Sequence, residues 1–186
     1  MWKLSKEDHS FLLSLARKTI FDHLHNQPLS PPGAIPEGLL LEKCGAFVTL
    51  TQAHQLRGCI GYTAALKPLY ETIMDCAVSA ATRDPRFAPL QAEELPRTHI
   101  EISVLSPMFE VKDVNEIVAG KHGLMISRGN RRGLLLPQVA TEYHLTREKF
   151  LDQTCMKAGL PPKSWKEPGT RIEAFTAVVF GEPEEE

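Results

Sequence analysis

The sequence predicts an α+β fold in which an N-terminal helix precedes a duplicated β-β-α-β unit with antiparallel sheets. Apolar residues recur at helical spacing in residues 6–25, and two pairs of β-rich segments each flank a short polar turn. Each pair is followed by a helical pattern and another β-rich segment, so one order of elements occurs twice. We therefore expect a single domain over residues 1–186, with two intimately packed halves at roughly residues 40–110 and 111–181.

The first helix has a recognisable start and a regular apolar stripe. Ser5 and Asp8 form a capping pattern, and the apolar residues that follow predict a helix over residues 6–25. The stripe consists of Phe11, Leu12, Leu15, Ala16, Ile20 and Leu24. Four prolines within residues 28–36 exclude regular structure in the next segment.

The first unit begins with a hairpin. Residues 45–51 and 56–62 are rich in β-formers and flank a polar turn at residues 52–55. Residues 66–82 then predict a helix, and residues 99–106 predict a strand. The buried face of that strand is expected to carry Ile100, Ile102 and Val104.

The second unit repeats this order. Residues 123–128 and 133–139 predict a hairpin around Gly129-Asn130, and Thr146 caps a helix that runs to about Ala158. Residues 171–180 form the last predicted strand.

Arg-Gly pairs support a duplication. Arg57-Gly58 opens the return strand of the first hairpin, and Arg132-Gly133 opens that of the second. An Ile-Glu pair follows in each unit, 43 residues beyond Arg57 and 40 residues beyond Arg132. The alternative is coincidence, because hairpin, helix and strand commonly occur in this order.

Composition and charge exclude several classes of protein. The 186 residues are 42% hydrophobic and 24% charged, and the net charge of -2 gives no general attraction to nucleic acid or anionic lipid. No apolar run is long enough to span a membrane, and the charged N-terminus lacks the apolar core of a signal peptide. The four cysteines form no CxxC pair, so we expect reduced thiols and a cytoplasmic location.

Residues 56–61, with the sequence LRGCIG, carry the most informative pattern. Strand alternation would place Arg57 and Cys59 on one face, with Leu56 and Ile60 on the other. Gly58 and Gly61 would leave open backbone beside both reactive groups, where a ligand could approach. We therefore place the candidate site on this strand.

Cys59 is the candidate nucleophile. Arg57 could supply a neighbouring cation and His54, in the adjacent turn, a base. Glu101 is a candidate acid-base group if its strand face is buried. The alternatives are a packed thiol at Cys59, since free cysteine is often buried, and a solvated face at Glu101.

Three arginines are candidates for binding a small anion. The planar guanidinium of Arg57 suits a carboxylate or phosphate, and Arg83 and Arg86 could frame the same cleft. Alternatively, Arg57 forms an internal ion pair with Glu101 or Glu42, and the segment around Arg83 is a solvated turn that pairs with itself.

Metal, cofactor and nucleic-acid sites have weaker support. No HExxH pattern or clustered cysteines occur, so we expect no metal, and the sequence indicates no cofactor. The basic hairpin tip with Arg128, Arg131 and Arg132 could contact phosphates, but aromatic residues at 7% are too sparse for stacking. Nucleic acid is therefore the least favoured partner.

Five motifs resemble those of the AMMECR domain family over residues 10–181. Besides residues 56–61, they are residues 83–87, 102–107, 133–139, and 155–160 followed by Trp165. The chain departs at His144-Leu145, where close bacterial relatives would carry Gly-Trp. The resemblance implies an α+β fold with a duplicated unit, and it gives no reaction.

The resemblance also implies partners. The short chain is similar to the stand-alone prokaryotic form, which is encoded with a Memo-like protein and a radical S-adenosylmethionine protein. Three functions follow as alternatives. The chain is an enzyme or enzyme subunit in a redox or modification pathway, acting at Cys59 and Arg57; a scaffold that docks to those proteins; or a nucleic-acid-binding regulator.

Overall fold

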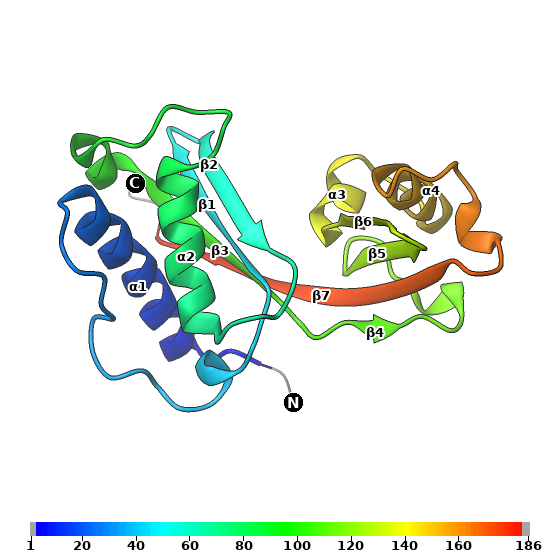
Figure 1. Ribbon diagram of the computed structural model, residues 1–186, viewed down its shortest axis with the longest axis horizontal. Helices are drawn as coiled ribbons and strands as arrows, with labels where there is room; N and C mark the ends of the chain where they lie inside the picture. The colour runs from blue at the N-terminus through cyan, green and yellow to red at the C-terminus, as the bar shows by residue number, and fades with distance from the viewer. Residues whose placement is uncertain (1–2, 184–186) are drawn as a thin grey trace. The chain divides into compact units, whose positions relative to one another are not determined.

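Antiparallel strands covered by helices make up the computed structural model, which describes residues 3–183 (Figure 1). The chain divides into two units, one of which is Ser106–Ala177. The other contains the chain up to Leu105 and the segment from Val178 onward, so the last strand, β7 (Arg171–Gly181), contributes to both. The combination of helices with antiparallel strands confirms the predicted α+β class.

The first unit begins as predicted. Helix α1 (Lys6–Leu24) has a capping box in which the Ser5 hydroxyl accepts the Asp8 N–H and the Asp8 carboxylate accepts the Ser5 N–H. Strands β1 (Ala46–Gln52) and β2 (Gln55–Tyr62) form the predicted hairpin. Its two turn residues have positive φ angles of 47° and 61°, as tight hairpin turns require.

Helices cover one face of the first sheet. Helix α2 (Leu69–Thr82) follows the hairpin, and strand β3 (His99–Leu105) pairs antiparallel with β1. The strand order is β2-β1-β3 with the end of β7 beside β3, so β2 is an edge strand. Figure 1 shows α1 and α2 on the same side of these strands. The core between them contains Leu12, Leu15, Val48, Leu50, Ile73, Ile100, Ile102 and Val104, as predicted for β3.

The second unit contains a second hairpin, β5 (His122–Arg128) and β6 (Arg131–Leu135), and β5 also pairs with β7. The prediction that residues 133–139 form one strand is wrong. The strand ends at Leu135 and helix α3 (Pro137–Glu142) begins, because Pro137 favours the first turn of a helix. Helix α4 (Arg147–Lys157) is capped by Thr146 as predicted, with the Thr146 hydroxyl accepting the Lys149 N–H.

Several short elements were not predicted from the sequence. Strand β4 (Phe109–Glu110) pairs with β7, and the described residues contain four 3₁₀ helices. They are η1 (Leu39–Leu41), η2 (Ala92–Arg97), η3 (Val114–Glu116) and η4 (Ser164–Lys166). The order hairpin, helix, strand is present in both units, and its origin by duplication stays a prediction. None of the helices within residues 3–183 is long and apolar enough to cross a membrane.

Candidate functional site

A β-bulge at Arg57 sets the geometry of the LRGCIG strand. Arg57 has no opposite residue on β1, because the register skips it. The pairs on either side are Leu50–Gly58 and Thr51–Leu56. Gly58 faces α2, and Cys59 lies on the opposite face of the sheet beside Thr49. The predicted shared face of Arg57 and Cys59 is therefore wrong, because the extra residue breaks the alternation.

Arg57 forms a bidentate ion pair with Glu94 of η2. Its Nε and Nη2 atoms donate to the two carboxylate oxygens over 3.1 and 3.0 Å, and Nη1 donates to the Ala88 carbonyl oxygen. The Arg57 hydrogen bonds are the main reason that the pKa of Glu94 falls to about 2. An ion pair was one of the predicted alternatives, but its partner is neither Glu101 nor Glu42. The three Arg57 nitrogens are thus occupied internally.

Asp84 holds the outer edge of β2 at Cys59. Its carboxylate accepts the Cys59 N–H over 2.9 Å, and Arg86 Nη2 donates to the Cys59 carbonyl oxygen over 3.3 Å. Asp84 also accepts from Arg86 Nε and Nη2 over 3.0 and 2.7 Å, which keeps the Asp84 pKa far below its usual range. The two side chains thus take the place that a neighbouring strand would occupy.

The contact of Asp84 with Cys59 shows that residues 83–87 are not simply a solvated turn. Residues 83–87 pair with themselves, as the alternative predicted, but the Asp84 side chain is only 2% exposed and is therefore not solvated. Arg86 is half exposed and donates to the Cys59 carbonyl oxygen. It is therefore Arg86, and not Arg57 as predicted, that places a cation beside Cys59. Arg83 ends α2, is exposed, and has no side-chain partner in the described part of the chain.

The two glycines of LRGCIG leave no open space. A Cβ atom on Gly58 would lie 2.2 Å from the Ala80 carbonyl oxygen of α2. A Cβ atom on Gly61 would lie 2.3 Å from the ring of Phe47, its cross-strand partner. The expectation that a ligand approaches the backbone there is wrong, because a helix turn and an aromatic ring already fill both positions.

Cys59, Thr49 and Glu101 form a row across three strands. Thr49 pairs with Cys59 on one side and with Glu101 on the other. The Cys59 Sγ and Thr49 Oγ1 atoms are 3.1 Å apart, and the two ends of the row lie roughly 10 Å apart, at two strand spacings. All three residues are half-buried, and within residues 3–183 the Glu101 carboxylate has no hydrogen-bond or ion-pair partner.

The other candidate residues lie away from this row. His54 is in the hairpin turn, one residue beyond the third pair from Cys59, or roughly 13 Å along the strand. At the second hairpin tip, Arg128 pairs with Glu167 and Arg131 donates to the Gly159 carbonyl oxygen. No group of three or more His, Cys, Asp or Glu side chains among the described residues could hold a metal ion.

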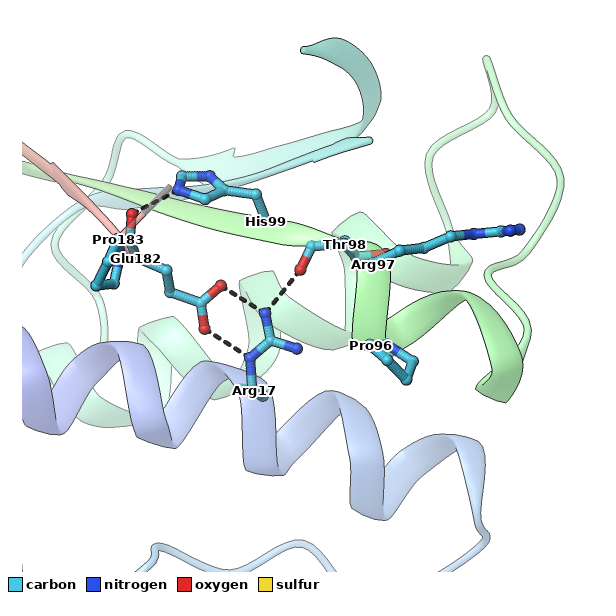
Figure 2. A pocket seen from close by; sticks show the side chains of 7 residues that line it. All are labelled: Arg17, Pro96, Arg97, Thr98, His99, Glu182 and Pro183. Carbon is cyan, nitrogen blue, oxygen red and sulfur yellow. Dashed lines mark hydrogen bonds and ion pairs between the residues drawn. The ribbon is translucent and has the colours of Figure 1, made fainter. Parts of the chain in front are cut away.

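A cavity of about 490 Å³ lies beside Arg17 of α1, between it and the start of β3, and the sequence patterns gave no sign of it. Figure 2 shows the Arg17 guanidinium between the Glu182 carboxylate and the Thr98 carbonyl oxygen, with Arg97 extending away from them. His99 Nε2 contacts the Glu182 carbonyl oxygen at 2.6 Å. These contacts fasten the end of β7 to the first unit.

Sequence reasoning missed three residues that shape the site. Thr49 could have been found, because pairing the two predicted strands of the first hairpin places it opposite Cys59. Asp84 was visible only as part of a polar turn, and its burial needs the packing of that turn against β2. Glu94 lies 37 residues from Arg57, and no local signal marks it as the partner.

Comparisons with known proteins agree on one family. The AMMECR1 family model matches residues 13–180. A protein of Methanothermobacter thermautotrophicus is 44% identical over 96% of both chains, and protein TK0174 of Thermococcus kodakarensis is 42% identical over 98% of this chain and 94% of its own.

A solved structure is also similar. The crystal structure of uncharacterized protein PH0010 from Pyrococcus horikoshii has a TM-score of 0.86 and 38% identity, covering 97% of this chain and 94% of that one. The family model spans most of the sequence, and both the relatives and the solved structure extend over nearly the full length. The chain therefore belongs to the AMMECR1 family.

Proposed function

We propose that this chain is a cytoplasmic enzyme or enzyme subunit that acts on a small anionic or peptide-like substrate through the Cys59 thiol. The row of Cys59, Thr49 and Glu101 carries the proposal. It combines a thiol, a hydroxyl group at 3.1 Å and a half-buried carboxylate that the fold leaves unpaired. Because no side chain within residues 3–183 occupies the Glu101 carboxylate, it is free to contact a substrate on this face of the sheet.

The side-chain contacts that hold strand β2 in place support the same proposal. Asp84 and Arg86 hold the Cys59 backbone, and the Arg57–Glu94 ion pair fixes the bulge two residues earlier. A reactive group needs this kind of positioning, because small displacements lower the rate of a reaction strongly. Asp84 neutralises the half-exposed guanidinium of Arg86, so this group offers a substrate beside Cys59 a hydrogen-bond donor rather than a free positive charge.

Alkylation of the folded protein tests the proposal. Cys44, Cys76 and Cys155 are buried and Cys59 is not, so iodoacetamide at neutral pH should add one group per chain, at Cys59. In Thr49→Val the rate should fall by a factor of roughly five, because the hydroxyl no longer stabilises the thiolate. Thr51→Val is the matched control, with a threonine at the next position of β1 on the same face.

Two results would count against a reactive thiol. The first is no modification of Cys59 while the chain stays folded. The second is an equal change of rate in Thr49→Val and Thr51→Val, which would show that Thr49 has no specific role. The first result would make Cys59 a packing residue, and the second would remove Thr49 from the proposed site.

Docking to a Memo-like protein and a radical S-adenosylmethionine protein is the second candidate. Exposed apolar side chains favour it: Leu56 and Tyr62 of β2 are more than 40% exposed, and Leu66 in the following loop is 73% exposed. Such residues next to a sheet edge are typical of protein contacts. Co-purification with either protein should be lost in Leu66→Lys and kept in Cys59→Ser. The same complex with both variants, or no complex with wild type, would exclude this surface.

A further inference from the structure

The second unit contains a groove that is separate from the Cys59 row. It lies between β6, α3 and α4, and its volume is about 420 Å³, within the range of small-molecule sites. Its apolar lining comes from Leu135, Val139, Leu145 and Met156. Met156 is 46% exposed, although it is a large apolar residue, whereas Phe150 and Leu151 of the same helix are buried.

The polar residues of this groove are all available to a ligand. Tyr143, Gln153 and Lys157 line it, and in residues 3–183 none of their side chains has a hydrogen-bond or ion-pair partner. Lys157 is the sole charged residue among the lining residues. The groove therefore offers an apolar wall, an ammonium group and two neutral hydrogen-bonding groups.

In two cavities of the first unit, a charged side chain of the lining already has a partner. The cavity in Figure 2 contains Arg17, whose guanidinium is occupied by Glu182 and by the carbonyl oxygens of Leu95 and Thr98. A second cavity beside α1 contains Lys18, which is paired with Asp22. Arg17 and Lys18 are thus paired within the fold, and Arg97 extends away from the cavity in Figure 2, whereas Lys157 lines its groove unpaired.

We propose that this groove binds a small amphiphilic anion, with an apolar body on the Met156 side and a single carboxylate-type group at Lys157. Charge complementarity selects the anion, because no acidic residue lines the groove. Burial of the apolar body supplies most of the affinity, and the exposed ion pair with Lys157 adds selectivity. The proposal does not depend on the function of Cys59.

Titration of the full chain with octanoate, followed by methyl NMR, tests the proposal. The signals of Met156, Leu135 and Val139 should shift saturably, and 1-octanol and octylammonium should bind more weakly. Lys157→Gln should weaken octanoate roughly two- to fivefold and leave 1-octanol unchanged. The matched control is Lys149→Gln, which removes another unpaired lysine of α4 that does not line the groove.

Met156→Glu provides a second variant at an exposed position, so the fold should survive it. It should abolish the shifts with octanoate and 1-octanol alike. The proposal is overturned by unsaturable shifts, by equal effects of the Lys149 and Lys157 variants, or by equal binding of the three probes. Shifts of the same methyl signals with protein concentration alone would overturn it too, since a second copy of the chain would then fill the groove.

Discussion

Replacing Glu94 by Gln tests how strongly its ion pair with Arg57 holds the bulged strand. The pKa of Glu94 falls from 4.5 to about 2, chiefly through the hydrogen bonds from Arg57. At about 1.36 kcal/mol per pKa unit, this difference limits the stabilisation to roughly 3 kcal/mol. The two side chains remain 16% and 18% exposed. Solvent screening therefore reduces the expected loss in Glu94→Gln to about 1.5–2 kcal/mol.

The effect of this substitution depends on pH in a defined direction. Because the folded-state pKa lies below the unfolded one, the full stabilisation is present above about pH 4.5 and disappears as the pH falls towards about 2. Urea unfolding at neutral pH should show the whole difference between wild type and Glu94→Gln, and less than half of it should remain at about pH 3.

The adjacent Glu93 supplies the control. It is exposed and has no partner among the described residues, so Glu93→Gln should change the free energy of unfolding by less than about 0.5 kcal/mol. Equal losses in the Glu93 and Glu94 variants, or a Glu94 effect of the same size at both pH values, would refute the reasoning.

Three further substitutions test the geometry around this strand and one turn. Asp84→Asn should cost about 2 kcal/mol of unfolding free energy and speed hydrogen exchange at the Cys59 amide, and unchanged exchange would show that the edge contact is dispensable. Gly58→Ala should cost about 1–3 kcal/mol in urea unfolding because its Cβ atom meets α2, more than Gly33→Ala, where nothing lies within 4 Å; the reverse order would contradict this packing. His144 has a φ of 50°, so His144→Gly should stabilise the fold by about 0.5 kcal/mol and raise the melting temperature. A lower melting temperature in this variant would argue against backbone strain at His144.

Local patterns predicted most of the elements. The Ser5–Asp8 cap and the apolar stripe of α1 belong to one helix, and Gly129-Asn130 is a turn-forming pair in the second hairpin. In the first hairpin the flanking strand patterns carried the prediction, because Ala53 and His54 do not favour a turn. The apolar residues of 133–139 misled the prediction, because a short run of this kind is compatible with a strand and with a helix. Pro137 was the available signal for the helix start.

The candidate site depends on contacts that no local pattern encodes. The bulge at Arg57 changes which residues share a face, and a period of two cannot reveal it. Asp84 and Glu94 reach the strand from 25 and 37 residues away, after α2 has turned the chain back. The sequence could therefore identify Cys59 and its strand, but not the partners that decide where each side chain points.

The two hairpins share one packing feature and differ in the contacts around Cys59. A Cβ atom added to Gly58 would lie 2.2 Å from the Ala80 carbonyl oxygen of α2. A Cβ atom added to Gly133 would lie 2.2 Å from the backbone nitrogen of Ala158, which follows α4. The glycine of each Arg-Gly pair thus lets a helix end approach a strand, as a duplicated unit would require. Only the first hairpin adds the ion pair with Glu94 and the contact of Asp84 at the strand edge. Because packing already explains the glycines in both units, the features peculiar to the first are those that position Cys59.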